Sequence, residues 1–399
     1  MRGVSKYMKN TLKLAEPIKI GSLSVLNRIV KAATVENMSN EKGEVTDRLI
    51  EFYAKQARGG AGLLITGGAY VQPDGRTGVH EMGVDDDSKI PGLMRLTDAV
   101  HSHGGKVILQ IGHSGRQTRP EVVDGNIIGP SPVKDRMTGI IPRAMTEVEI
   151  DGVIASHGKA AKRARQAGFD GVEVMAGHGY LINQFLSGRT NRRKDKWGGI
   201  LAKRASLLFR ILENVKKEAG TEFPLLVKIN TDDFIKNGFT TDECAWVVEK
   251  FVEYGVNAIK LTGGTYESAL NICRGEMPEK EILEEYSGLQ KLMTKLIIKS
   301  MKNKFKFSEA YFIEKAKQIK RNTTIPLILV GGLRTPALME KILQESHADM
   351  IALGRPLIRE PNFPRKILSG GTAPSSCINC NKCFIKIIQN KPLSCHANK

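Results

Sequence analysis

The amino-acid sequence predicts an α/β protein: a closed (β/α)8 barrel with a short cysteine-bearing extension at its C-terminus. The first observation is that short apolar runs alternate with stretches of helical spacing along most of the chain. The second is that eight such βα units fit a closed barrel better than an open sheet. The third is that no Gly-x-Gly-x-x-Gly follows the first run, where an open dinucleotide-binding sheet would carry it.

Each apolar run is short and continuous rather than alternating. That pattern is typical of a parallel strand that is buried on both faces. The runs are Ile29–Thr34, Leu63–Thr66, Val107–Ile111, Gly171–Met175, Leu225–Ile229, Ala258–Thr262, Leu327–Val330 and Met350–Leu353.

Helical spacing characterises the stretches between these runs. Two of the helices are expected to begin with a capping box, at Thr146 with Glu149 and at Thr240 with Glu243. The expected helices are Thr46–Arg58, Met94–His103, Glu147–Gln166, Leu201–Glu218, Asp242–Tyr254, Glu309–Lys320 and Pro336–Gln344.

The chain is expected to divide into a barrel over residues 1–368 and a cysteine segment over residues 369–399. Residues 1–27 precede the first strand and are expected to close the bottom of the barrel. The long segments His113–Met145 and Gly263–Ser308 follow strands 3 and 6 and are candidate lids over the site.

Composition is that of an ordinary globular protein, with 41% hydrophobic and 26% charged residues among 399. No apolar run is long enough for a membrane span, and the first twenty residues lack the apolar core of a secretory signal. A cytoplasmic protein without membrane contact is therefore expected.

The net charge of +18 is unevenly distributed, since residues Lys291–Arg321 contain ten lysines or arginines and two glutamates. The simpler interpretation is a solvated helical face. The other is a docking surface for an acidic electron carrier or an anionic part of a substrate. Nucleic-acid binding is not expected, because no recognised motif or aromatic stripe accompanies the charge.

Polar residues and glycines follow the apolar runs, at the barrel end where active sites lie. Gly331-Gly332 and Gly354-Arg355 follow the last two runs, where barrels bind phosphate through backbone N–H groups and an arginine. The glycines could instead serve only tight turns. Gln110 and Lys228 suit the pyrimidine edge of a flavin, because an amide both donates and accepts and a cation stabilises the reduced anion. Each could also be a buried polar residue satisfied inside the barrel.

Several separated motifs, in the same order along the chain, resemble the old yellow enzyme family of FMN-dependent ene-reductases. The most informative is Asp170–Ser187, which contains Gly177-His178-Gly179-Tyr180. The others are Glu16-Pro-Ile-Lys-Ile-Gly21, Asn27-Arg-Ile-Val30, Gln110-Ile-Gly-His-Ser-Gly-Arg116, Asn191–Gly199, Val330-Gly-Gly332 and Ala352-Leu-Gly-Arg-Pro356. The order and number of these motifs make the resemblance specific.

The resemblance implies an FMN site and two catalytic residues. His178 would lie above the flavin and polarise a substrate carbonyl, and Tyr180 would donate a proton to the carbon opposite the one that receives hydride. A phenol is protonated at neutral pH, and an imidazole stabilises charge on an enolate oxygen. Tyr180 could instead only line the pocket. The implied FMN contacts are Ala33, Thr34, Gly68, Gln110, Lys228, Gly331, Gly332, Gly354 and Arg355.

Three further positions are implied to contact the substrate. Met175 stands three residues before His178, where many relatives have His or Asn. Tyr266 stands on the loop after strand 6, where the dienoyl-CoA reductase branch has a histidine. Arg189 would bind an anionic part of the substrate. Val35 occupies the place beside the flavin where relatives have Cys or Thr.

Four of the six cysteines are clustered in the last residues: Cys377, Cys380, Cys383 and Cys395. Their spacing suits four-cysteine zinc and a [4Fe–4S] cluster about equally. The segment resembles the cluster motif of trimethylamine dehydrogenase and 2,4-dienoyl-CoA reductase, which favours iron and sulfur over zinc. Cys244 is interpreted as ordinary helix packing.

These observations predict an enzyme that reduces the C=C bond of an α,β-unsaturated carbonyl or thioester. Electrons would come from NAD(P)H, or from an external carrier through the cluster. One alternative is an amine dehydrogenase or demethylase that passes electrons outward, and another is a non-catalytic electron-transfer subunit. A small-molecule substrate, a ferredoxin-like or subunit electron partner and a homo-oligomeric state are expected.

Overall fold

The computed structural model describes residues 12–397 except 124, 285 and 302–305. Eight parallel strands close into a barrel, because the last strand pairs with the first. The predicted barrel is therefore confirmed, and all eight predicted runs form strands. In order around the barrel they are β3 (Ile29–Lys31), β4 (Leu63–Tyr70), β6 (Val107–Gly112), β9 (Val172–Ala176), β10 (Leu225–Asn230), β11 (Ala258–Thr262), β12 (Leu327–Val330) and β13 (Met350–Leu353).

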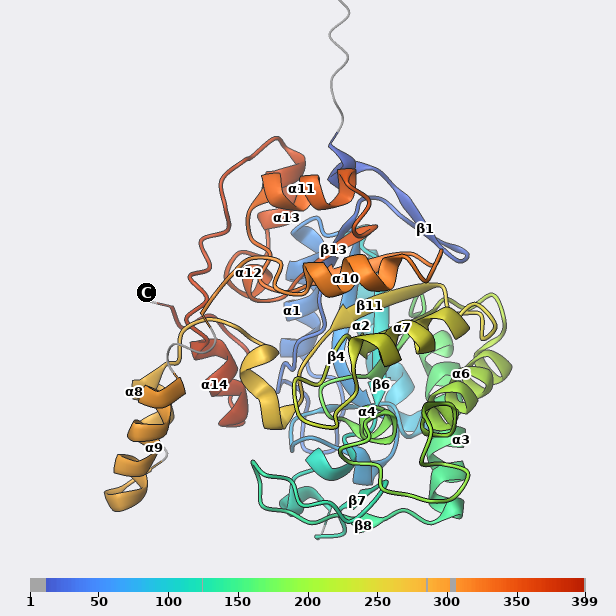
Figure 1. Cartoon of the computed structure of the whole chain (residues 1–399). Coiled ribbons are helices and arrows are strands. Elements are labelled where there is room, and N and C mark those ends of the chain that lie inside the picture. The colour runs from blue at the N-terminus through green and yellow to red at the C-terminus, as the bar shows by residue number, and fades with distance from the viewer. Residues whose placement is uncertain (1–11, 124, 285, 302–305, 398–399) are drawn as a thin grey trace, which may run out of the picture.

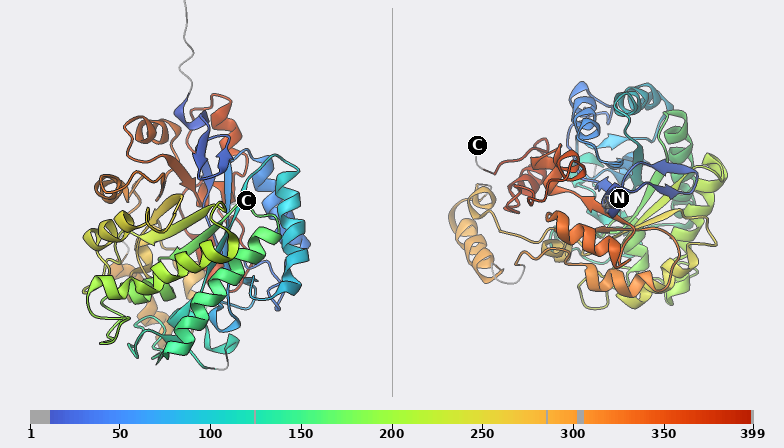
Figure 2. Two further views of the ribbon diagram at one scale, coloured as in Figure 1. Left: turned by 90° about the vertical axis from the view of Figure 1, so that its right-hand side faces the viewer. Right: turned by 90° about the horizontal axis from the view of Figure 1, so that it is seen from above.

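Helices form a ring around the strands, as the view from above in Figure 2 shows. They are α1 (Asp47–Arg58), α2 (Ile90–His101), α3 (Glu147–Gln166), α6 (Ser206–Ala219), α7 (Thr241–Lys250), α10 (Ile313–Lys320) and α11 (Pro336–Gln344). Both predicted capping boxes are present, at Thr146 and at Thr240.

Four helix boundaries differ from the prediction. Helix α2 begins at Ile90 rather than at Met94, with Pro91 in its first turn. A separate short helix, α5 (Leu201–Arg204), precedes α6, so the predicted helix is divided at Ala205. Helix α7 ends at Lys250, and the following residues form turns. Helix α10 begins at Ile313 rather than at Glu309. Ala310 has a φ of 52°, and the carboxylate of Glu309 accepts hydrogen bonds from the backbone N–H groups of Arg334 and Thr335. A left-handed residue interrupts the helical path, so the helix starts after it.

A two-stranded sheet closes the bottom of the barrel, as predicted, within residues 12–27; residues 1–11 of that prediction lie outside the described residues. It consists of β1 (Ile18–Ile20) and β2 (Leu23–Val25), paired antiparallel. Ile20 and Val25 are buried and belong to the same apolar cluster as Leu63 of β4 and Ile108 of β6. This cluster fills the interior at the N-terminal ends of the strands.

Charged side chains replace apolar ones higher in the barrel. The strand register places Gln110 beside Glu173 and Lys228 beside Lys260, and all four are buried. The Nζ atom of Lys260 lies 2.6 Å from Oε1 of Glu173, to which Gln110 also donates a hydrogen bond. Buried ionised groups need partners of this kind because their desolvation is costly.

The long loops are structured and lie mostly at the C-terminal ends of the strands. The segment after β6 contains β7 (Ile128–Gly129) and β8 (Arg143–Ala144). The segment after β11 contains α8 (Glu279–Leu283) and α9 (Gly288–Met301), which project from the body of the barrel (Figure 1). The chain after α12 (Arg355–Arg359) and α13 (Phe363–Leu368) leads to α14 (Lys382–Ile388). Ion pairs Lys382–Glu281 and Lys386–Glu284, each 3.0 Å, join α14 to α8 and the residue just beyond it.

Among the described residues, no helix is both long and apolar enough to cross a membrane.

Candidate active site

The open end of the barrel at the C-terminal ends of its strands is called the mouth. The first and last strands, β3 and β13, bring their C-terminal ends together there. Thr34 follows β3, and its hydroxyl accepts a hydrogen bond from Nζ of Lys31 at 3.1 Å. A side chain on Gly354, after β13, would lie 3.8 Å from Cγ2 of Thr34. Ala33 is half-buried and packs against the apolar cluster of the barrel interior. Val35, next along, is half-buried as well.

The ends of β12 and β13 form a cradle beside a half-buried cation, Arg355. Gly331 and Gly332 have φ angles of 135° and 72°, conformations that other residues rarely adopt. The guanidinium of Arg355 donates to the carbonyl oxygen of Arg274 at 2.9 Å and to Oδ1 of Asn381 at 2.6 Å. No carboxylate pairs with Arg355 in the part of the chain that the structure describes. The glycines and the guanidinium suit a phosphate group.

Lys228 is the second cation at the mouth that forms no ion pair with a carboxylate of the described residues. Its side chain is 6% exposed and has neither a hydrogen bond nor an ion pair to any described residue. Burial, together with the positive charge of Lys260, lowers the pKa of Lys228 to about 7. An anion at the mouth would therefore stabilise the charged ammonium. Two uncompensated cations fit a cofactor with a phosphate and an electron-rich ring edge, which is the chemistry of FMN.

His178 lies on the loop that joins β9 to α4 (Leu181–Leu186). Its φ of 58° is strained for a residue with a side chain, and its backbone N–H donates to Oδ1 of Asn230 at 3.0 Å. Nε2 lies 2.6 Å from the hydroxyl oxygen of Thr262. Burial, and then the charges of Lys228 and Lys260, hold the pKa of His178 well below its usual range. The imidazole is consequently neutral at physiological pH.

Tyr180 and Tyr266 lie next to one another across the mouth. Their hydroxyl oxygens are 3.3 Å apart, and their ring centroids are 5.9 Å apart. Tyr266 comes from the 3-10 helix η6 (Tyr266–Asn271) after β11. Burial, and then Tyr266, raises the pKa of Tyr180 well above its usual range, so the phenol is protonated at neutral pH. The structure thus brings together two residues that the sequence predicted separately.

The other two expected substrate contacts, Arg189 and Met175, both contact other residues of the protein. Nη2 of Arg189 lies 3.4 Å from Oε2 of Glu267, whose other oxygen lies 2.8 Å from Nη2 of the buried Arg116. Met175 is buried in β9, where its Cβ would lie 3.0 Å from a side chain on Gly112. An anionic ligand of Arg189 would therefore have to compete with Glu267.

Sequence reasoning missed Glu173, Lys260 and Glu81. Glu173 and Lys260 could have been found in the sequence, because each is a charged residue inside an apolar run. Glu81, whose carboxyl group lies beside Gly68, could not, since nothing in the sequence indicates that its segment adds a short strand, β5 (Met82–Gly83), beside β4.

The four cysteines of the C-terminal segment are all half-buried. In the described part of the chain, however, no group of three or more His, Cys, Asp or Glu side chains lies close enough to hold a metal ion. The donor set is present, but it is not assembled as a site. Cys244 is buried in α7, as predicted.

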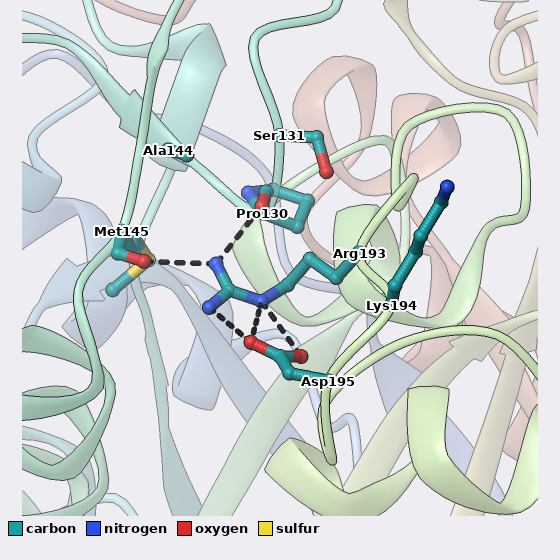
Figure 3. Close-up of a pocket in the computed structure, with 7 residues that line it drawn as sticks. All are labelled: Pro130, Ser131, Ala144, Met145, Arg193, Lys194 and Asp195. Atoms are coloured by element: carbon teal, nitrogen blue, oxygen red, sulfur yellow. Dashed lines mark hydrogen bonds and ion pairs between the residues drawn. The ribbon is translucent and has the colours of Figure 1, made fainter.

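A shallow hollow of about 560 Å³ lies between β7–β8 and the loop after Arg189. Figure 3 shows the guanidinium of Arg193 there, held by Asp195 and by the carbonyl oxygens of Pro130 and Met145, while Lys194 points away. The Arg193 guanidinium is already hydrogen-bonded by described residues of the protein. The chemistry of the mouth lies elsewhere.

Comparison with known proteins agrees with this geometry. The model of the NADH:flavin oxidoreductase / NADH oxidase family matches residues 13–278 and 274–372. An NADH oxidase of Thermoanaerobacter brockii is 36% identical over 95% of this chain and 55% of its own length. A 4,4'-dithiodibutanoate disulfide reductase of Rhodococcus erythropolis is 35% identical over 94% of this chain and 93% of its own.

A solved structure of 2-naphthoyl-CoA reductase superimposes with a TM-score of 0.83 at 31% identity, covering 96% of this chain and 56% of that one. The chain thus spans little more than half the length of that reductase and of the NADH oxidase. The resemblance predicted from the motifs is confirmed. The chain belongs to the NADH:flavin oxidoreductase / NADH oxidase family, the FMN-dependent oxidoreductases of the old yellow enzyme type.

Proposed function

We propose that this oxidoreductase reduces the C=C bond of an α,β-unsaturated carbonyl or thioester. The observation that carries the proposal is the pair His178 and Tyr180, an uncharged imidazole and a protonated phenol on one loop at the mouth. A relative of similar barrel structure is named for its action on a naphthoyl-CoA thioester, which supports this substrate class.

The proposed cofactor contacts divide between the two ends of FMN. Gly331, Gly332 and Arg355 would hold the phosphate, with Ala33, Thr34 and Gly354 beside them. Gln110, Lys228 and Gly68 would contact the ring. FMN, when bound, exchanges a hydride with the substrate or with NAD(P)H.

The chain's own groups supply the remaining chemistry. His178 would donate a hydrogen bond to the carbonyl oxygen and stabilise the enolate that develops there. Tyr180 would then transfer its phenolic proton to the α carbon. Met175 and Tyr266 would border the substrate, and Arg189 would bind an anionic part of it if Glu267 moves aside.

For the C-terminal residues, we propose a segment 369–399, distinct from a barrel over 1–368, that binds a [4Fe–4S] cluster through Cys377, Cys380, Cys383 and Cys395. The four thiols in two close spacings support this, and zinc is the other occupant that such a set accepts.

For the electron partner, we propose an acidic, ferredoxin-like carrier that docks on α9. Leu289, Leu292, Met293 and Leu296 recur at helical spacing on α9 and are 56–72% exposed. Exposed Lys291, Lys295 and Lys299 lie on the same helix, which carries no acidic residue. An apolar stripe beside lysines is typical of a transient interface with an acidic protein.

Replacing Arg355 by leucine should weaken FMN binding about 10- to 100-fold, because a charge-assisted contact to phosphate is lost. Titration of apoprotein with FMN, followed by flavin fluorescence, measures the change. Arg365→Leu is the matched control, since Arg365 is exposed on α13 and donates only to the Arg58 carbonyl oxygen. Equal affinity for FMN in both variants would exclude Arg355 and its neighbouring glycines as the phosphate site.

The variant Tyr180→Phe should lower turnover of an enone or enoyl thioester by about 10²–10⁴, because the proton donor is removed. Rapid reduction of bound flavin by NADH should be unchanged, which separates the two half-reactions. Tyr254→Phe, on the outer surface against Phe209, is the control. Undiminished enone turnover would refute the role of Tyr180, and flavin reduction by an amine in place of NADH would favour the amine dehydrogenase alternative.

Anaerobically purified protein should contain about four iron and four sulfide per chain, the stoichiometry of a [4Fe–4S] cluster. The Cys380→Ser variant should lose most of both, while Cys244→Ala, buried in α7, should keep them. Iron and sulfide analysis with the visible spectrum measures this. One zinc per chain without sulfide would contradict the assignment.

Changing Lys291, Lys295 and Lys299 together to glutamate should slow reduction by an acidic [2Fe–2S] ferredoxin about tenfold or more at low salt and abolish its dependence on ionic strength. Stopped-flow spectroscopy measures the rate. The same reversal at Lys159, Lys162 and Lys217, which are exposed on α3 and α6, is the control. Equal slowing in both triple variants would place docking elsewhere.

A further inference from the structure

The hydroxyl group of Thr262 contacts His178, although the proposed function gives it no role. Thr262 is the last residue of β11, and its Oγ1 lies 2.6 Å from Nε2 of His178. In the strand register Thr262 pairs with Asn230 of β10, whose Oδ1 accepts the backbone N–H of His178 at 3.0 Å. Two neighbouring strand ends therefore hold His178, one by its backbone and the other by its ring.

The loop can lie this close to the strand ends because Gly177, the residue before His178, has no side chain. A Cβ atom on Gly177 would lie 2.8 Å from Oδ1 of Asn230 and 3.1 Å from Cγ2 of Thr262. The first of these distances is shorter than the contacts that a real Cβ atom makes. His178 also forms an isolated parallel bridge with Thr265. The backbone on both sides thus places the imidazole against Thr262.

The hydrogen of the Thr262 hydroxyl needs an acceptor, because the group is buried. Thr262 is 3% exposed, and in the described part of the chain Nε2 of His178 is the one hydrogen-bond partner of its Oγ1. If Nε2 carried a hydrogen and donated it to Oγ1, the hydroxyl hydrogen would be buried without an acceptor, which is costly. If Nε2 is unprotonated, the hydroxyl donates to it and the hydrogen is satisfied.

The other ring nitrogen of His178 then carries the hydrogen of the imidazole. Burial is the main reason that the pKa of His178 lies well below its usual range, so the ring is neutral and has a single N–H group. Nδ1 forms no hydrogen bond with any described residue, and the side chain of His178 is half-buried rather than enclosed. An N–H group at Nδ1 is therefore available to a ligand at the mouth.

We propose that Thr262 selects the tautomer of His178 in which Nδ1 is protonated, and that this N–H group is the donor to the substrate carbonyl. The inference rests on the proposed function, in which His178 donates to that oxygen. In the opposite tautomer Nδ1 would be an acceptor and could not bind a carbonyl oxygen, which is also an acceptor. Thr262 acts through His178 and is a positioning residue.

The direct test is long-range ¹H–¹⁵N NMR spectroscopy of FMN-loaded protein labelled with ¹⁵N-histidine, because the two ring nitrogens give different cross-peak patterns. The His178 signals are identified by their absence in His178→Ala. Nδ1 should be protonated in wild type and in Thr262→Ser, which keeps the hydroxyl. In Thr262→Val the ratio of the Nδ1–H to the Nε2–H tautomer should fall about tenfold, because one hydrogen bond is lost. A protonated Nε2 in wild type would overturn the inference.

Turnover of cyclohexenone, a simple enone, separates this role from a purely structural one. Thr262→Val should lower kcat about tenfold while its FMN content stays at the wild-type level, and Thr262→Ser should retain most of kcat. Thr231→Val is the matched control, since Thr231 is buried after the end of β10 and its hydroxyl has no hydrogen-bond partner among the described residues.

The failure of this inference and that of the proposed function give different results. Wild-type kcat in Thr262→Val, with His178→Ala impaired, overturns the role of Thr262 and leaves the proposed function standing. Equal losses in Thr262→Val and Thr231→Val overturn it as well. Undiminished enone turnover in His178→Ala overturns the proposed function itself.

Discussion

The charge balance inside the barrel is the constraint on which the site depends. Lys260 is neutralised by Glu173, and Lys31 lies 3.4 Å from Glu36, but Lys228 is buried with no partner among the described residues. Desolvating a lone cation is costly, and the neighbouring Lys260 adds repulsion. The desolvation of Lys228 can be offset by an anion bound near the C-terminal ends of the strands. Burial, and then the charges of Lys228 and Lys260, keep the imidazole of His178 neutral.

The loop that carries His178 and Tyr180 is held by its neighbours in the barrel. The strained φ of His178 is maintained because Asn230, at the end of β10, accepts its N–H and donates in turn to Asp233 at 2.8 Å. An isolated bridge joins His178 to Thr265, just before Tyr266. The loops after β9, β10 and β11 are thus tied to one another, so the imidazole and the two phenols are positioned by strands rather than by loop packing alone.

The sequence predicted the barrel because its strands are continuous apolar runs. It predicted Gln110, Lys228 and Arg355 as cofactor contacts because each is a polar residue near the end of such a run. It also contained Glu173 and Lys260 as charges within apolar runs, and their inward direction could have been inferred from the two-residue period of a strand. Glu81 could not be found, since its position depends on how β5 aligns with β4. The predicted start of α10 was wrong because the periodicity of apolar residues does not reveal that Ala310 adopts a left-handed conformation.

Arg355 is shared between two regions of the molecule. Its guanidinium holds both the Arg274 carbonyl oxygen and the Asn381 side chain, and Asn381 also donates to the Cys273 carbonyl oxygen. One side chain therefore spans the barrel cradle, the loop after β11 and the cysteine segment. A shift in any one of these three parts would therefore alter the hydrogen bonds that hold the other two.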